Sequence, residues 1–172
     1  MSEPGAVTDG SLLDAERFKE FYDRALPIVY GYFFRRVGGS TSMAADLTQE
    51  TFVTAVRTLQ RGAVVDAPLP WIVSIARRRL VDHFRSISGG QRAVPGRPSQ
   101  GDGSTSAAES RLTGALASLS PDHRLVLVLR YVDDLTVAEV ANSLGRSMRA
   151  TESLLVRARA ALSTVYEGTS DV

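Results

Sequence analysis

The sequence contains no cysteine, and this absence excludes disulfide bonds and cysteine-ligated metal sites from the 172-residue chain. The two histidines, His83 and His123, are far apart in sequence, and two imidazoles alone do not make a zinc site. We therefore expect neither a metal ion nor any other cofactor, and we set thiol and metal chemistry aside as functions of this chain.

A long hydrophobic run is also missing, since no stretch of about 18 apolar residues occurs. The start of the chain lacks the basic residues and the following hydrophobic stretch that characterise a secretory signal. From these two absences we expect no membrane partner and a cytoplasmic protein.

Charge of one sign is not in excess, because 20 basic and 19 acidic residues leave a formal net charge of +1. This balance is unlike that of a protein that coats nucleic acid everywhere, so nucleic-acid binding would depend on local basic patches. Lysine is nearly absent, with Lys19 the single exception to arginine among the basic residues. The guanidinium fork suits phosphate and guanine, but a GC-rich genome would produce the same skew through its codons.

Large apolar residues are scarce from residue 86 to residue 110, where glycine, serine, proline, glutamine and alanine dominate. Such a stretch buries too little surface to offset the entropy of ordering it, which predicts a flexible linker at 86–110. The linker would separate an N-terminal unit at 11–85 from a C-terminal unit at 111–167. Disordered tails are expected at 1–10 and 168–172. No alternating strand pattern is present, so we predict an all-α fold of two small helical domains.

The N-terminal unit begins with apolar residues at spacings of three and four from Phe18 to Val37, which predicts one long amphipathic helix. Gly38 and Gly39 would end it. Ser42 is a suitable N-cap for a second helix that runs to about Leu59.

One side of this second helix is apolar, and the opposite side is mostly polar and charged. A solvated face would explain the charges. The valine among them is a sign of a protein partner instead. The residues of this opposite side are Asp46, Gln49, Glu50, Val53 and Arg57.

A loop at 62–70 that contains prolines leads into a third predicted helix, which would end near Arg85. This helix holds the densest basic patch of the chain, for which nucleic acid is the natural partner. A basic helix end would also complement the helix dipole without any ligand. The patch consists of Arg77, Arg78, Arg79, His83 and Arg85.

The C-terminal unit shows a series of helix starts and stops. Ser120-Pro121 has the sequence of an N-cap followed by a first helical residue, and Thr136 with Glu139 has that of a capping box. Gly145 would end that second helix, and Ser147 would cap the next one. This order is typical of a DNA-binding helix-turn-helix, and it also fits an ordinary helical hairpin. In the last helix we expect Met148, Thr151, Leu155, Ala158 and Leu162 to face inward.

Both units resemble the extracytoplasmic-function (ECF) sigma factors, group IV of the sigma factors related to the housekeeping type, which direct bacterial RNA polymerase to promoters. The segment Asp46–Phe52 is similar to the sigma region 2 signature, and Trp71–Arg85 is similar to the segment that reads the −10 element. The C-terminal unit resembles region 4, which binds the −35 element in the family. The resemblance lies in residues 119–121, 127–131, 135–141, 144–145 and 157–159.

The resemblance implies partners and site residues for both units. Region 2 would dock on the clamp helices of the largest polymerase subunit through Asp46, Gln49, Glu50 and Val53. The −10 element would be contacted by Trp71, Arg77, Arg78, Arg79, His83 and Arg85. The −35 element would be contacted by Arg146, Ser147, Arg149, Ala150, Glu152, Ser153 and Arg157. Further implied partners are the flap of the second-largest subunit, promoter DNA and an anti-sigma factor, and the linker would thread through the polymerase cleft.

The sequence departs from the family pattern in four places. Residues 149–152 read Arg-Ala-Thr-Glu where Gly-Thr-Val-Lys is usual, Leu154 stands where arginine is usual, and Arg78 stands where asparagine is usual. Glu152 would repel a phosphate and accept a hydrogen bond from cytosine, whereas Arg149 suits a phosphate or a guanine. In the family, the loop at 61–69 captures bases of the melted strand, but its composition differs here and we assign it no residue-level role.

Two other functions are weighed against this one. Residues 111–167 would suffice for a stand-alone helix-turn-helix regulator that binds operator DNA as a dimer. An enzyme acting on nucleic acid would need clustered carboxylates, a metal site or an activated nucleophile, and none is present in the sequence. The adjacent pair Asp133-Asp134 is interpreted as a helix cap, and we expect no enzyme.

Overall fold

The computed structural model describes residue 12, residues 14–88 and residues 107–168 of the chain. All regular structure in these residues is helical, which confirms the all-α prediction. Most of the predicted linker and the predicted N-terminal tail lie outside the described residues, as do residues 169–172. No helix of the described residues has the length and apolar character to cross a membrane.

Helix α1 spans Ala15–Arg36, three residues longer at its start than the apolar pattern predicts. Its start is set by Asp14, whose Oδ1 accepts hydrogen bonds from the backbone nitrogens of Glu16 and Arg17 at 2.9 and 3.3 Å. The helix ends before Gly38, which has a φ of 74° and lies in the left-handed region that glycine adopts most easily. The predicted glycine stop is therefore confirmed.

Helix α2 spans Thr41–Gln60, and its N-cap is Ser40 and not the predicted Ser42. Ser40 has an extended backbone and its Oγ accepts from the nitrogen of Met43 at 3.4 Å, whereas Ser42 already lies inside the first turn. The prediction was wrong because both serines are possible caps and the two glycines leave the chain free to begin the helix early.

Helix α3 spans Pro68–Ser88, so the predicted loop at 62–70 extends three residues too far and the predicted helix ends three residues too early. Both prolines near its start lie in the first turn, where the missing N–H group would have no helical partner in any case. The helix thereby includes the first residues of the segment predicted as a linker.

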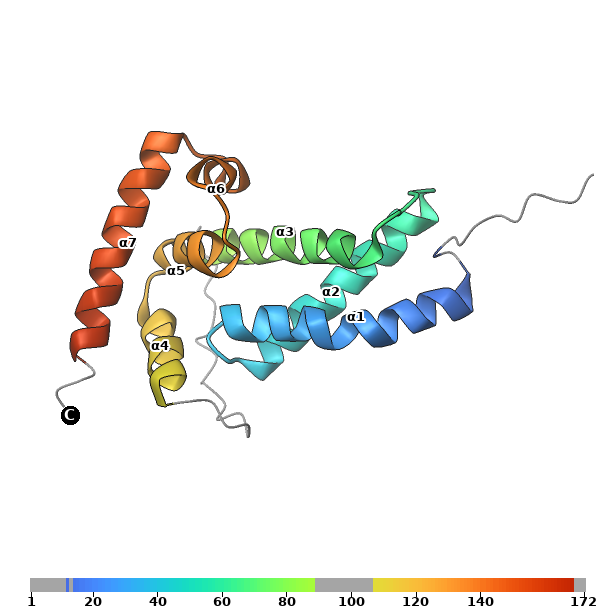
Figure 1. Ribbon diagram of the computed structural model, residues 1–172, viewed down its shortest axis with the longest axis horizontal. Helices are drawn as coiled ribbons and strands as arrows, with labels where there is room; N and C mark the ends of the chain where they lie inside the picture. The colour runs from blue at the N-terminus through green and yellow to red at the C-terminus, as the bar shows by residue number, and fades with distance from the viewer. Residues whose placement is uncertain (1–11, 13, 89–106, 169–172) are drawn as a thin grey trace, which may run out of the picture.

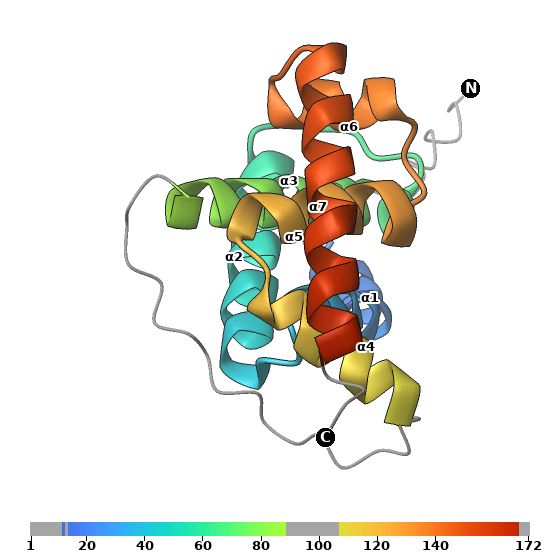
Figure 2. The same ribbon diagram turned by 90° about the vertical axis from the view of Figure 1, so that its left-hand side faces the viewer.

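The C-terminal part contains four α-helices and one π-helical turn among the described residues, and α4 was not predicted because it consists largely of small and polar residues. Their bounds are α4 Ala107–Ser118, α5 Pro121–Leu127, η1 Val128–Val132, α6 Val137–Leu144 and α7 Met148–Gly168. In Figure 1, α1, α2 and α3 form one body, and α5 of the second body lies beside the C-terminal end of α3. Figure 2 shows α7 as the outermost layer, lying across α4 and α5.

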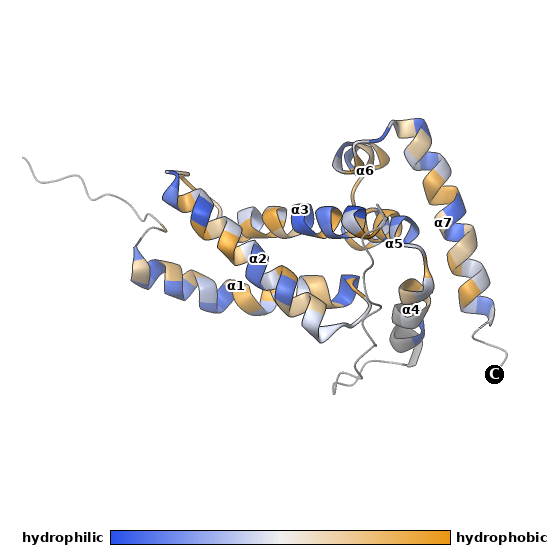
Figure 3. Ribbon diagram, turned by 180° about the vertical axis from the view of Figure 1, so that it is seen from behind, coloured by the Kyte–Doolittle hydropathy of each residue, from blue (hydrophilic) through white to orange (hydrophobic). Residues whose placement is uncertain are grey.

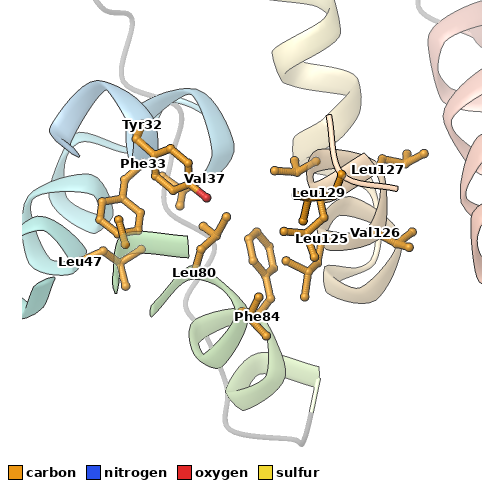
Figure 4. Packing of buried hydrophobic residues seen from close by; sticks show 14 of the residues in the cluster. Tyr32, Phe33, Val37, Leu47, Leu80, Phe84, Leu125, Val126, Leu127 and Leu129 are labelled. Atoms are coloured by element: carbon orange, nitrogen blue, oxygen red, sulfur yellow. The ribbon is translucent and has the colours of Figure 1, made fainter. Parts of the chain in front are cut away.

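Apolar residues form stripes along the helices, as the colouring of Figure 3 shows for α1 and α7. These stripes meet in one hydrophobic core that continues from the N-terminal body into the C-terminal body. Figure 4 shows Phe84 of α3 between Leu80 of the same helix and Leu125 and Leu129 of the C-terminal body. The sequence predicts two units joined by a linker, and in the structure the two are in direct contact.

Candidate protein and nucleic-acid interfaces

Helix α2 divides into a buried and an exposed face as its sequence predicts. Leu47, Thr51 and Phe52 are buried in the N-terminal body. The opposite face carries exposed residues, including Val53 at 41% exposure among polar neighbours. An exposed valine on a polar face favours contact with a protein over simple solvation. All four residues predicted to bind polymerase lie on this face: Asp46, Gln49, Glu50 and Val53.

An apolar groove between α1 and α2 adjoins this face, and the sequence analysis did not identify it. Gln49 and Val53 of the predicted docking face belong to its rim. The tilted ring pair Tyr22–Phe52, with centroids 4.6 Å apart, forms part of its floor. The spacing of apolar residues predicts that these rings face the core. It does not indicate that a groove leaves part of their surface accessible from outside. The groove extends the docking face with apolar surface.

The basic patch of α3 is not a single free surface. Arg78 and Arg85 are exposed, whereas Arg79 donates to Thr54 Oγ1 of α2 at 2.5 Å. Arg77 is turned toward the C-terminal body, where its Nε lies 3.4 Å from Oδ2 of Asp133. Arg85, although exposed, donates from Nη2 to Ser143 O of α6 at 3.1 Å, so three of the four arginines predicted as −10 contacts have protein partners among the described residues.

His83 and Trp71, the other predicted −10 contacts, are each half-buried. Burial lowers the pKa of His83, and the nearby Arg124 acts in the same direction against the opposing effect of Glu50. The Nε2 atom of His83 is buried without a hydrogen-bond partner among the described atoms. The imidazole therefore packs mainly as a neutral side chain in this structure.

The helix-turn-helix is formed by α6 and α7, and its capping box is present as predicted. The Thr136 hydroxyl accepts from the Glu139 nitrogen at 3.3 Å, while Glu139 Oε2 accepts from the Thr136 nitrogen at 2.8 Å. The Thr136 hydroxyl also donates to Glu139 Oε2 at 2.7 Å, and this bond, followed by the one from the Thr136 nitrogen, lowers the pKa of Glu139. Gly145 has a φ of 59° and ends α6, as predicted.

Helix α7 begins where Ser147 Oγ accepts from the Ala150 nitrogen at 3.2 Å, in agreement with the predicted cap. Thr151, Leu155 and Ala158 are buried, as expected. Met148 is 55% exposed, so its predicted inward position is wrong, and Leu154 is buried instead. Met148 fits the buried stripe by spacing, but no helix covers it at the first residue of α7.

The predicted −35 contacts lie on the first turns of α7 and in the turn before it, and all are exposed. Arg146 already has a partner, since its Nη2 lies 2.8 Å from Asp122 Oδ2 of α5. Small and polar side chains on a free helix start are what a major groove accommodates. The residues with this exposure are Arg146, Ser147, Arg149, Ala150, Glu152, Ser153 and Arg157.

Neither face has the composition of a metal or catalytic centre. The described part of the chain contains no group of three or more histidine, aspartate or glutamate side chains placed to hold a metal ion. The two faces are built from exposed polar, charged and aliphatic side chains.

Comparisons with known families agree with this division into two regions. The family model described as "Sigma-70 region 2" matches residues 21–89, which include α2 and α3. The model described as "Sigma-70, region 4" matches residues 109–162, which include the helix-turn-helix. The fold and the two faces thus define a sigma-70-type protein with regions 2 and 4, and those names are used below for its two bodies.

Two curated relatives show which group of sigma factors the chain is similar to. The ECF RNA polymerase sigma factor BldN of Streptomyces coelicolor is 32% identical over 158 residues, which cover 84% of this chain and 58% of BldN. The ECF RNA polymerase sigma factor SigC of Mycobacterium tuberculosis is 33% identical over 125 residues, which cover 69% of this chain and 68% of SigC. The chain belongs to the ECF sigma factor family.

A solved structure supports the fold. The sigma factor RpoE of Bartonella quintana, solved in complex with the anti-sigma factor NepR, matches with a TM-score of 0.53 and 21% identity. The match covers 89% of this chain and 98% of RpoE. At this identity the likeness concerns the arrangement of helices.

Proposed function

We propose that this chain binds core RNA polymerase in the cytoplasm and directs promoter-specific transcription initiation. The observation that carries the proposal is the pairing, in one chain of this family, of an exposed docking face on α2 with an exposed helix-turn-helix on α7. Region 2 would contact the clamp helices of the largest subunit and the −10 element. Region 4 would contact the flap of the second-largest subunit and the −35 element.

The docking contact of region 2 combines polar and apolar surface. Asp46, Gln49, Glu50 and Val53 supply the exposed face of α2, and the aromatic groove beside them can accept apolar side chains of a polymerase helix. A polar rim around a small apolar centre is the usual composition of a protein interface that forms and dissociates. An interface of this kind suits a subunit that leaves core polymerase after initiation.

The DNA contacts are divided between two small faces. Arg78 and Arg85 are the exposed cations of α3 and would bind phosphate or base edges of the −10 region, Arg85 after release of its hydrogen bond to Ser143 O. Arg149, Glu152 and Arg157 would do the same in the major groove at −35. Each face alone is small, but docking both on one polymerase makes the second contact intramolecular and raises the overall affinity.

The chemistry of the proposal is binding without a covalent step. Capture of an unstacked base offsets the cost of opening the duplex, a few kcal/mol for each base. The protein would act as a transcription factor and not as an enzyme, and an anti-sigma factor is a further expected partner.

Reconstituted transcription tests the proposal. Core polymerase with this chain should produce transcripts from defined promoter starts, and core polymerase alone should not. The variant Asp46→Arg places a cation on the docking face and should reduce binding to core polymerase. Glu20→Arg makes the same charge change on an exposed position of α1 outside that face and is the matched control.

Gel-shift measurements separate the proposal from a stand-alone regulator. A sigma factor should shift promoter duplex only in the presence of core polymerase, whereas a dimeric regulator would shift it alone. Absence of any promoter-specific transcript with active core polymerase, or reduced core binding by Glu20→Arg equal to that of Asp46→Arg, would contradict the proposal.

A further inference from the structure

Arg146, one of the predicted −35 contacts, is held by another helix of region 4. Its Nη2 donates to Oδ2 of Asp122 at 2.8 Å, and Asp122 lies in the first turn of α5. The two residues are 24 positions apart in the sequence, so the contact joins the start of α5 to the turn between α6 and α7. Both partners belong to region 4, and the contact therefore does not depend on where region 2 lies.

The backbone of Arg146 is fixed as well. The Gly145 nitrogen donates to Asn142 O at 3.2 Å. The Arg146 nitrogen donates to Ala141 O at 3.0 Å. These two hydrogen bonds, with Gly145 in the left-handed region, form the Schellman motif that ends α6. Ser147 then caps α7, so the backbone of Arg146 is held between two helix ends and only its long side chain needs further ordering.

The ion pair contributes more to the orientation of Arg146 than to the stability of the fold. The side chains of Arg146 and Asp122 are 41% and 35% exposed. An ion pair that is this open to water stabilises a protein little, because water screens both charges. An arginine side chain has many rotamers, however, and a ligand that binds a free one must restrict them. A contact that already restricts them removes part of this cost.

An aspartate in the first turn of a helix also has a purely structural explanation. Its charge complements the positive end of the helix dipole, and Asp122 occupies such a place in α5. That role requires no partner on another element. Asp122 nevertheless has two, because its Oδ1 accepts from Ser88 Oγ of α3 at 2.6 Å while its Oδ2 accepts from Arg146. The second of these contacts lies at the proposed −35 face.

The other arginines predicted to contact the −35 element are held differently. Arg149 and Arg157 are exposed on α7 itself. Arg157 donates from Nε to Ser153 O at 3.3 Å, one turn earlier on the same helix. Of these three arginines, Arg146 is the one that a second element holds in the described part of the chain.

A guanidinium in this position suits a phosphate of the DNA backbone. The contact with Asp122 occupies Nη2, and the other N–H donors of the planar group remain available to a second anion. Because Asp122 draws the side chain toward α5, the guanidinium lies beside the start of α7. A recognition helix has base edges in front of its start and phosphates at its sides. Arg146 would thus fix the position of the helix, while Arg149 and Glu152 read bases.

We propose that Arg146 binds a backbone phosphate beside the −35 element and that Asp122 is the positioning residue that holds Arg146 ready for it. The inference rests on the proposed function, since it concerns the same −35 face. Asp122 does not itself contact DNA, and its negative charge alone repels a phosphate. Its effect on DNA affinity through Arg146 therefore has the opposite sign to the effect of its charge, and this difference can be measured.

Promoter binding by the holoenzyme, formed from core polymerase and the full chain, tests the phosphate contact. Arg146→Ala should weaken binding to a promoter with a −35 element. It should also reduce the magnitude of the slope of log affinity against log salt by about 0.9, the value for one lost phosphate contact on B-DNA. The preferred −35 sequence should stay the same, because a phosphate carries no base identity. An unchanged salt slope, or a changed sequence preference, would overturn the phosphate contact.

A double-mutant cycle tests the positioning by Asp122. Asp122→Ala should lower the promoter affinity by about two- to tenfold, because the Arg146 side chain must then be ordered during binding. In the Arg146→Ala background the same change should cause no loss. Glu167→Ala is the matched control, since it removes an exposed carboxylate at the far end of α7. It should leave the affinity unchanged in both backgrounds.

The alternative roles of Asp122 give different results in this cycle. If Asp122 acts only through its charge, Asp122→Ala raises the affinity with and without Arg146. If it only supports α5, Asp122→Ala lowers the affinity equally in both backgrounds. Either result would overturn the positioning role. A wild-type holoenzyme that shows no preference for promoter DNA over unrelated duplex would instead contradict the proposed function, so the two failures are distinguishable.

Discussion

Arg79 of α3 is held on the surface of α2, where its Nη1 lies 3.7 Å from Oε2 of Glu50 and its Nη2 donates to Thr54 Oγ1. The sequence places Arg79 in the basic patch expected to contact the −10 element. Its partners place it instead beside the predicted polymerase face, where Asp46, Glu50 and Arg79 line one hollow. An arginine in this position neutralises part of the acidic face and fixes the orientation of Glu50.

Arg79→Ala is therefore expected to weaken binding to core polymerase more than it changes −10 preference. Exposed ion pairs contribute about 0.2 to 1 kcal/mol, so the affinity for core should fall by a factor of about 1.4 to 5. Arg78→Ala is the matched comparison, because Arg78 is the exposed neighbour. Its effect should fall on promoter DNA and not on core. Fluorescence titration with core polymerase and transcription from −10 variants measure the two effects separately, and the reverse pattern would refute this division.

Helix α7 supplies a second prediction, on the −35 element. Arg149 and Glu152 are exposed on its first turns, and both differ from the residues usual in the family. We expect Arg149 to bind a guanine edge, so Arg149→Ala should reduce the free-energy difference between the preferred and the wrong base at that −35 position by about 1 to 3 kcal/mol. Glu152→Gln should weaken selection of cytosine on the contacted strand. Transcription from a library of −35 sequences measures both.

Arg159→Ala is the control for these variants, because Arg159 is exposed on the same helix outside the proposed contacts. It should leave the preferred −35 sequence unchanged. Identical sequence preferences for wild type, Arg149→Ala and Glu152→Gln would show that the recognition helix reads DNA through other residues.

The turn between α6 and α7 gives a prediction on stability. Gly145 has a φ of 59°, and an added Cβ would lie 3.3 Å from Nη2 of Arg85. Gly145→Ala should lower the free energy of unfolding by about 1 to 2 kcal/mol, since alanine enters the left-handed region at a cost. Gly145→Asn should lose less, because asparagine tolerates that conformation. Denaturant titration compares them, and equal losses would mean that the crowding at Arg85 and not the backbone decides the cost.

Local signals made much of region 4 predictable from sequence. In the capping box, Thr136 and Glu139 satisfy each other's hydrogen bonds, and Gly145 ends α6 through its own backbone conformation. The formation of these two motifs depends little on distant parts of the chain. The same holds for the two faces of α2, where Thr51 and Phe52 are buried and Val53 is exposed. An apolar stripe as long as the one on α2 determines which face of the helix is buried.

Contacts between distant residues were beyond the reach of the sequence. Asp133 meets Arg36 across nearly a hundred residues, and no spacing rule connects them. Asp133 is the C-cap residue of η1, as its place at a helix end predicts. Its carboxylate accepts hydrogen bonds from Tyr32 and Arg36 of α1, and no local signal in the sequence indicates these partners. The partner of Arg79 was missed for the same reason.

Acid should weaken the fold through His83, the histidine of α3. Its pKa in the folded chain is lowered below the ordinary value of 6.5, first by burial and then by Arg124, with Glu50 opposing. The unfolded chain then binds the proton more readily than the folded one, so this contribution to stability is full above pH 6.5 and is lost as the pH falls below it. Unfolding by urea at a series of pH values from neutral downward measures the slope. His83→Gln should flatten that slope, while His123→Gln removes the other histidine and should leave most of it. If His83→Gln loses stability with falling pH as steeply as wild type, another group and not His83 carries the effect.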